Sequence, residues 1–541
     1  MTSRSDRAAL WLFIAYLLAA VPILVVGIGS DRWFSQDEWY FFDGRSINAR
    51  DLTAPYFGHL VALPIIAWRL TFRLVGLHAY WPYQLQVVSL HLVACALLRL
   101  VMRRSGVGPW PATIVAGTLV LFGSGATNIL SAFQISFMGS FVFGLTQLLL
   151  TDSDDPVIAR RDVVALLAGF AAVSCSSVGV GMVGLVGLAV WLRRGWKPAA
   201  LQVLPPAIMI GTWYVTMRSR QLPVGAPDST PEGNILEVAA RIAGWNLHAL
   251  RAALEGFGLS NWGLTVPTAI GLGALVLIGC WASWQHRQSR PLPLVLVVGA
   301  LMFMTLAAAG RGRYPAEYAA VPRYVYVVGA LLLPAMALGF QKLVEQRRAL
   351  WVPLLLLIAL GVPANIGGFE DEDDYADIKA RVLAVAASPH LKSADPSLTL
   401  LPSPFLPGPS VGWIAEAKRA GDLPEGGPVS PELQSWTDRY LAIQQSDRAR
   451  PYLNCELGST YLGVVMEPSK GDVIGVRVLD ENGKEPARAQ IRLTLLTADD
   501  EPRPAGQRVF ELNDGHRFEF VGDGLRLRLI SSEGLVEVCR G

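Results

Sequence analysis

An acidic pair lies inside an aromatic segment near the start of the chain. Residues 29–44 read GSDRWFSQDEWYFFDG, and Asp37 and Glu38 are adjacent within it. Aromatic residues such as Trp39 could seat this segment at a membrane surface, so that a carboxylate there serves as general base or contacts a substrate. Desolvation would raise the pKa of such a carboxylate, and a nearby arginine would lower it. Alternatively, the acids belong to a solvated loop and the aromatic residues only form an interfacial belt.

A second segment concentrates positive charge late in the apolar part of the chain. Residues 310–324 read GRGRYPAEYAAVPRY, with Arg311, Arg313 and Arg323, followed by Tyr324. Arginine is costly near hydrocarbon and its guanidinium binds phosphate with two parallel hydrogen bonds, so the segment predicts an anion-binding loop. Arg323 at a helix start would add the positive end of the helix dipole. Alternatively, Arg311 and Arg313 only attract anionic headgroups.

Three uncharged or weakly basic residues complete the set of candidates. His59, Asn128 and Gln134 are expected at the outer face, where they could bond a sugar, and His59 could assist Asp37. Each could equally be a structural polar contact. The chain contains no P-loop, HExxH, CxxC or GxSxG pattern, so the usual residues of ATP-driven transport, zinc proteolysis and serine hydrolysis are missing.

The composition indicates the scaffold that must position these residues. Of 541 residues, 52% are hydrophobic and 17% charged, and 46 basic residues nearly balance 44 acidic ones. The mean hydropathy is +0.38. This excludes a cytosolic enzyme, a nucleic-acid binder and a disordered chain, and indicates a polytopic membrane protein.

About eleven segments are apolar and long enough to cross a bilayer. The expected spans are 8–28, 80–101, 110–122, 134–150, 163–174, 179–192, 199–217, 264–284, 292–308, 324–340 and 350–366. The fifth and sixth share one apolar stretch, for which a deep turn or a single tilted helix is an alternative. Basic residues in the short loops place the N-terminus in the cytoplasm and, with an odd number of spans, the C-terminus outside. Residues 56–76 are apolar but carry His59, Arg69 and Arg73, and are predicted to lie in the outer interface.

The chain is expected to contain three domains. They are a membrane domain at 1–367, an extracytoplasmic linker with short helices at 368–454 and an extracytoplasmic β-sandwich at 455–541, whose short alternating runs are typical of strands. Cys455 and Cys539 bracket the sandwich, where they could form a disulfide or remain free thiols. Residues 8–28 are expected to stay as an anchor, without signal-peptide cleavage.

Taken together, this layout resembles the GT-C superfamily of polytopic glycosyltransferases. The shared features are an acidic pair after the first span (Asp37-Glu38-Trp39), an interfacial stretch with His59, ten or more spans, an arginine-bearing late outer loop and an outer β-domain. The bias towards Ala, Gly, Arg and Val is typical of actinobacteria, in which such enzymes use decaprenyl-phosphate sugars to build arabinan and mannan.

The resemblance implies an inverting sugar transfer from a polyprenyl-phosphate donor to a glycan or glycolipid acceptor at the outer face of the plasma membrane. Asp37 would be the base, with Glu38 next in line, and Arg323 or Arg311 would hold the donor phosphate. No cofactor is required, although Asp37 and Glu38 could hold a divalent cation. The alternatives are a lipid-glycan or solute transporter, or a non-catalytic subunit of a cell-envelope assembly.

Overall fold

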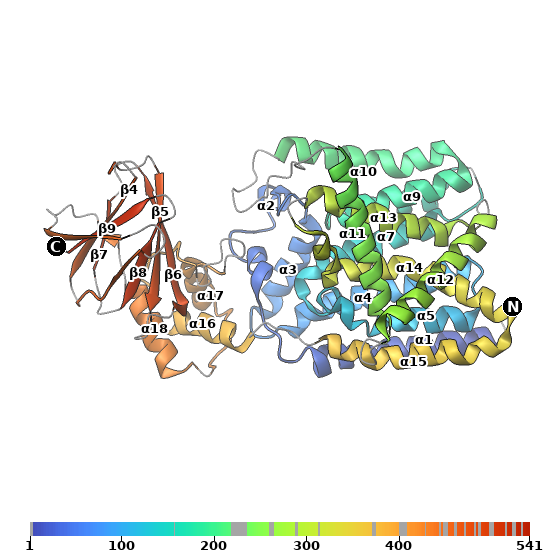
Figure 1. Cartoon of the computed structure of the whole chain (residues 1–541), viewed down its shortest axis with the longest axis horizontal. Coiled ribbons are helices and arrows are strands. Elements are labelled where there is room, and N and C mark those ends of the chain that lie inside the picture. Colours follow the sequence, from blue (N-terminus) through green and yellow to red (C-terminus); the bar gives the residue numbers. More distant parts are fainter. Residues whose placement is uncertain are drawn as a thin grey trace. The chain divides into compact units, whose positions relative to one another are not determined.

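The computed structural model divides the chain into two compact units (Figure 1). The helical unit comprises Met1–Ser30, Ser46–Thr71 and Trp81–Glu372, and the mixed unit comprises Asp31–Arg45, Phe72–Tyr80 and Asp373–Gly541. The structure describes residues 4–540 except 156, 218–234, 259–263, 287–289, 312–313, 370–374, 400–407, 428, 443–444, 447–452, 459–462, 470–471, 481–482, 485–487, 497–501, 514–516, 522–525 and 532–533.

The helical unit is a bundle of long apolar helices with short connections. Its elements are α1 (Arg4–Pro22), η1 (Ile23–Ile28), α2 (Ala49–Thr53), α3 (Ala62–Val75, whose end belongs to the mixed unit), α4 (Trp81–Arg104), α5 (Pro109–Val120), η3 (Gly123–Gly125), α6 (Ala126–Leu130), η4 (Ala132–Gln134), α7 (Ile135–Thr151), α8 (Arg160–Val173), α9 (Val178–Arg194), α10 (Trp196–Met217), α11 (Ile235–Gly256), α12 (Thr265–Gln285), α13 (Leu292–Gly310), η7 (Ala316–Ala320), α14 (Pro322–Gln346), η8 (Arg348–Leu350), α15 (Trp351–Ile366) and η9 (Gly367–Phe369).

Every segment expected to span a membrane contains a helix. Seven of the helical stretches in the described residues are long and apolar enough to cross a bilayer, and the pair α5 and η3–α6, bent by 56°, raises this number to eight if it is one span. Helices α8, α9 and α15 have 14, 17 and 16 residues and are shorter than these seven. The chain is therefore mostly helical with the spans of a membrane protein, and the count of eleven stays a prediction.

Glycines let the central helix α14 approach α12 closely. A Cβ added at Gly279 of α12 would lie 1.8 Å from the carbonyl oxygen of Ala335, and one added at Gly339 of α14 would lie 1.9 Å from that of Leu275. Small residues of this kind allow membrane helices to pack backbone against backbone. Helix α14 is consequently buried along most of its length.

The mixed unit combines short helices with two antiparallel sheets. The helices are η2 (Gln36–Phe41), α16 (Tyr375–Ala387), α17 (Val411–Ala420) and α18 (Pro431–Ala442). The strands are β1 (Gln445–Ser446), β2 (Leu453–Gly458), β3 (Val464–Met466), β4 (Val473–Leu479), β5 (Arg488–Leu496), β6 (Pro502–Asn513), β7 (Arg517–Val521), β8 (Leu527–Ile530) and β9 (Leu535–Arg540). Their orders are β1-β7-β4-β9-β2 and β3-β8-β5-β6. A small C-terminal strand region is thus present, and the sandwich arrangement stays a prediction, as do the three domain boundaries.

The aromatic segment after the first span belongs to the mixed unit. Trp33, Phe34, Trp39, Phe41 and Phe42 are at most 4% exposed. They pack with one another and with residues distant in the sequence, such as Trp413. The expectation that these aromatic residues seat the segment against a bilayer is therefore wrong, because their rings form part of a protein core.

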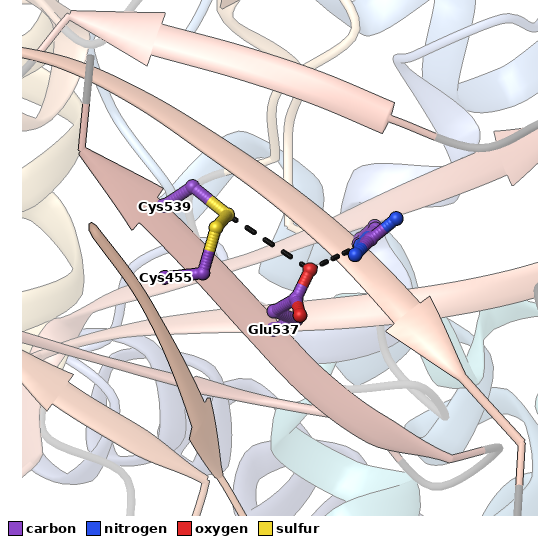
Figure 2. The surroundings of a disulfide bond; sticks show 4 residues. Cys455, Glu537 and Cys539 are labelled. Atoms are coloured by element: carbon purple, nitrogen blue, oxygen red, sulfur yellow. Dashed lines mark hydrogen bonds and ion pairs between the residues drawn. A yellow bond between two sulfur atoms is a disulfide. The ribbon is translucent and has the colours of Figure 1, made fainter. Parts of the chain in front are cut away.

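Cys455 and Cys539 form a disulfide with an S–S distance of 2.08 Å. They are directly opposite each other on the paired strands β2 and β9. Figure 2 shows Glu537 beside the bond, with a carboxylate oxygen 3.9 Å from Cys539 Sγ. The same carboxylate forms an ion pair with Arg477. The disulfide closes a sequence separation of 84 residues, so it restricts the unfolded state of nearly the whole strand region.

Candidate functional site

Glu38 stabilises the start of η2. Its Oε2 accepts a hydrogen bond from the Ser35 backbone N–H at 3.0 Å, and its Oε1 accepts one from the Tyr80 hydroxyl at 2.7 Å. Ser35 and Glu38 make the capping box at the start of η2, and Glu38 is 3% exposed. Asp37 precedes it and is partly exposed. Asp37 is therefore the more accessible of the two carboxylates.

Trp39 packs within the mixed unit. Its ring centroid lies 6.0 Å from that of Phe34 and 6.1 Å from that of Trp413 on α17. Phe42 also contacts Trp413, at 5.7 Å, and the Ser410 backbone N–H donates to the Asp43 carboxylate at 2.8 Å. The segment that carries Asp37 is thus fixed against the start of α17. This arrangement gives Trp39 a packing role in the structure and leaves its predicted substrate contact untested.

A basic cluster forms in the helical unit where η7 meets the start of α14. We define this basic cluster as His59, Arg311, Tyr318, Arg323 and Tyr324. Both guanidinium groups lie close to the Tyr318 ring, that of Arg311 at 6.0 Å and that of Arg323 at 5.7 Å, and the Tyr318 hydroxyl accepts a hydrogen bond of 2.6 Å from Arg323 Nη2. The Arg323 guanidinium also lies 5.4 Å from the Tyr324 ring. Cation–π contacts therefore hold both arginines in place.

His59 belongs to the same cluster and is uncharged at neutral pH. It lies in the loop before α3, paired through the backbone with Tyr56. Burial, and then the positive charges of Arg311 and Arg323, lower its pKa to about 4. Burial disfavours the charged imidazolium, and the two nearby arginines disfavour it further, so His59 is neutral beside two cations.

Buried polar atoms without a hydrogen-bond partner accompany the cluster. Among the described residues, Nδ1 of His59, Oδ1 of Asn128 and Oε1 of Gln134 have none. The Asn128 amide donates to the Arg323 carbonyl at 3.4 Å, which places it beside the cluster. Gln134 follows Phe133, whose ring contacts that of Tyr56. Since buried polar groups are normally satisfied, these three atoms indicate a polar ligand or water.

Some arginines expected on the cytoplasmic side have acidic partners, and others, such as Arg348, have none among the described residues. Arg103 pairs with Asp6 at 3.1 Å, Arg193 pairs with Asp154 at 2.5 Å, and Arg194 pairs with Asp162 at 2.6 Å. In the part of the chain that the structure describes, Arg311 forms no ion pair with a carboxylate. An arginine at a membrane protein's partly buried site without an acidic partner favours an anionic ligand.

The candidate residues divide between the two units. His59, Arg311, Arg323 and Tyr324 come together in the helical unit, whereas Asp37, Glu38 and Trp39 belong to the mixed unit. Arg313 lies outside the described residues. Tyr318, whose ring lies close to both arginines, was not predicted from the sequence. Its i, i+4 spacing from Tyr314, whose ring stacks on it at 4.4 Å, is the signal that could have indicated it.

Asp37 and Glu38 belong to no group of three ligand-type side chains among the described residues, and a divalent cation there stays a prediction. Both oxygens of the Glu38 carboxylate already accept hydrogen bonds. The ligand-type trio that the described residues do contain is Cys455, Glu537 and Cys539. Its sulfur atoms are bonded to each other, so they do not offer thiolate ligands.

Comparison with known proteins adds no family assignment. The chain matches no protein-family model and shows no significant similarity to a curated protein. Its function must be inferred from the arrangement of its own residues.

Proposed function

We propose that this protein is a membrane glycosyltransferase of the GT-C type, which transfers a sugar from a polyprenyl-phosphate donor to a glycan or glycolipid acceptor of the cell envelope. The observation that carries the proposal is the basic cluster. Two arginines fixed around Tyr318, with Arg311 lacking an acidic partner among the described residues, suit a phosphate group.

The leaving group of the reaction would be the polyprenyl phosphate. Arg311 and Arg323 would stabilise the negative charge that develops on it as the bond to the sugar breaks. A phosphate needs no acid catalyst to leave. Neutral His59 can form a hydrogen bond with the phosphate or with a sugar hydroxyl. The proposed reaction requires no cofactor, and a divalent cation is optional.

The proton of the acceptor hydroxyl would pass to Asp37. Attack on the anomeric carbon from the side opposite the phosphate then inverts its configuration. Glu38 is a positioning residue in this proposal, because its hydrogen bonds to Ser35 and Tyr80 hold η2 and with it Asp37. Asn128 and Gln134 supply amide oxygens that suit the hydroxyls of the transferred sugar.

The proposal includes the finer topology expected from the sequence. Eleven spans would cross the plasma membrane, the N-terminus would lie in the cytoplasm, and the strand region would form an extracytoplasmic β-sandwich. The basic cluster and the strand region would then both lie on the outer side of the membrane.

Donor binding tests the proposal at the cluster. The purified protein in lipid nanodiscs is titrated with a polyprenyl phosphate carrying a photoreactive group, and Arg323→Ala is compared with Arg348→Ala, a variant of an exposed arginine outside the cluster. Loss of a charge-assisted hydrogen bond should weaken binding by about 1.5–3 kcal/mol for Arg323→Ala and leave it unchanged for Arg348→Ala. Equal binding by both variants would remove the main support for the proposal.

A further inference from the structure

Helix α11 (Ile235–Gly256) lies between the expected spans 199–217 and 264–284, in a stretch for which the sequence predicts no span. At 22 residues it would be about 33 Å long, enough to cross a bilayer. It is nevertheless not among the seven candidate spans, and it carries charged residues along its length. In Figure 1, α11 runs across the direction followed by α1, α9 and α15 of the same unit.

One side of α11 packs on the basic cluster. Trp245 is fully buried, and its ring centroid lies 6.1 Å from that of Tyr318 and 6.2 Å from that of Tyr324. Ala249 and Ala253, one and two turns further on, are also fully buried. The helix therefore forms part of the wall that holds the two tyrosines, and through them the two arginines.

The end of α11 is anchored at the bent span. Phe257, directly after the helix, stacks on Phe122 with ring centroids 4.3 Å apart and nearly parallel planes. Phe122 lies between α5 and η3, where the chain bends by 56°. This contact fixes the C-terminal end of α11 within the bundle, so the helix is not a loosely attached surface segment.

A second side of α11 is charged. His248 lies 3.9 Å from Glu317 of η7, and Arg251 pairs with Glu255 at 2.7 Å. Projected at 100° per residue, Glu237, Arg241, His248, Arg251 and Glu255 fall within one arc of the helix. This charged arc faces the loop of the basic cluster, which marks the polar side of α11.

The third side of α11 is apolar and exposed. Ile235, Leu236 and Leu247 are 84%, 76% and 67% exposed, and they project on one arc together with the exposed alanines 239, 240 and 243. The candidate spans α12 and α13, against which α11 packs, also expose large apolar side chains, such as Leu277 and Leu306. An apolar arc adjoining such spans suits hydrocarbon and not water.

We propose that α11 lies in the membrane–water interface, with its apolar arc in the acyl chains and its charged arc among the headgroups, so that it binds the lipid surface directly. A helix with one charged side and one apolar side lies in the interface plane with the apolar side sunk about 5–10 Å. Because α11 forms the wall of the basic cluster, the lipid surface would set the depth of the two arginines. This inference concerns the lipid contact of α11 and holds whether or not the protein transfers sugar.

Depth-dependent quenching tests the inference on the full-length protein in nanodiscs. An environment-sensitive fluorophore is attached to a cysteine introduced at Leu247, at Arg251 on the charged arc or at Leu277 in the middle of α12. Labelled positions are all exposed, so the fold should persist, and an unchanged tryptophan melting curve verifies this. The lipids carry bromine either near the headgroup end of the acyl chain or near its methyl end.

The inference predicts a blue-shifted emission at Leu247 that shallow bromines quench more strongly than deep ones. The probe at Arg251 should keep the emission of an aqueous site, and the probe at Leu277 should be quenched most by deep bromines. If deep bromines quench Leu247 as strongly as Leu277, α11 crosses the membrane and the inference is wrong. If no lipid quenches Leu247, water, a second copy or another protein covers the arc, and the inference is equally wrong.

Discussion

Substitutions of Asp37 and Glu38 should distinguish a role in sugar transfer from a role in stabilising the fold. Glu38 accepts two hydrogen bonds at 3% exposure, and each hydrogen bond to a charged group stabilises by about 1.5–3 kcal/mol. Glu38→Ala should therefore destabilise the mixed unit by about 3–6 kcal/mol, and Glu38→Gln, which keeps one carbonyl acceptor, by about half of that. Asp37→Asn should change stability by no more than about 0.5 kcal/mol, as expected for a partly exposed residue.

The rate of sugar transfer should show the opposite order, with a larger loss for Asp37→Asn than for Glu38→Gln. Asp37→Asn keeps the shape of the side chain but cannot accept a proton at neutral pH, so the rate should fall by roughly 10²–10⁴-fold. Glu38→Gln should retain activity in the fraction of protein that stays folded. Stability is followed by tryptophan fluorescence on heating, and transfer by release of radiolabelled sugar from its polyprenyl phosphate.

A mutant cycle checks the cause of the stability loss. Tyr80→Phe removes the donor to Glu38 Oε1, so its effect and that of Glu38→Gln should be less than additive, with a coupling of about 0.5–3 kcal/mol. A result in which Glu38→Gln is fully stable yet inactive, while Asp37→Asn transfers at the unmutated rate, would make Glu38 the base. If both variants are fully active, the acidic pair has no part in the chemistry.

Three further outcomes follow from the structure. Burial, and then the positive charges of Arg311 and Arg323, lower the pKa of His59 to about 4. An anion that offsets those charges should raise this pKa and bind with proton uptake. Affinity for a dialkyl phosphate, whose charge is constant, should therefore rise about two-fold or more from pH 8 to pH 5, and titrations with His59→Gln should show a flat profile. Replacing Cys455 and Cys539 by serine should destabilise the strand region by about 2–5 kcal/mol, measured by limited proteolysis, and resistance equal to that of the oxidised protein would show that the bond does not support the fold. A membrane-impermeant thiol reagent should label Ser393→Cys and spare Ser5→Cys in intact cells, and the reverse pattern would contradict the topology.

Much of the helical unit could be predicted because apolar character is a local property. Each expected span, from 8–28 to 350–366, contains a helix, since twenty apolar residues must satisfy their own backbone hydrogen bonds in lipid. Residues 235–256 were not predicted as a helix, because their buried, charged and exposed apolar sides average to a moderate hydropathy. Their amphipathic period, and not their mean, was the signal for α11.

The candidate site depended on contacts that a single sequence does not record. Glu38 meets Tyr80, 42 residues away, and Trp39 meets Trp413 on a helix far along the chain. Without these partners, a run of aromatic residues next to a span is indistinguishable from a membrane belt. His59, Arg311 and Arg323 could be proposed as separate ligands, but only the fold places the Tyr318 ring close to both arginines.

Sugar transfer by the purified protein is the most direct measurement. Nanodiscs holding the protein are supplied with radiolabelled decaprenyl-phosphate sugars and an envelope glycolipid fraction, and radioactivity in the acceptor is counted for the unmutated chain and for Asp37→Asn, Arg323→Ala and Arg348→Ala. We expect at least one donor to be used, with transfer retained by Arg348→Ala and lost from the other two variants. Transfer from no donor by protein that binds decaprenyl phosphate, or transfer unaffected by both Asp37→Asn and Arg323→Ala, would contradict the proposed function.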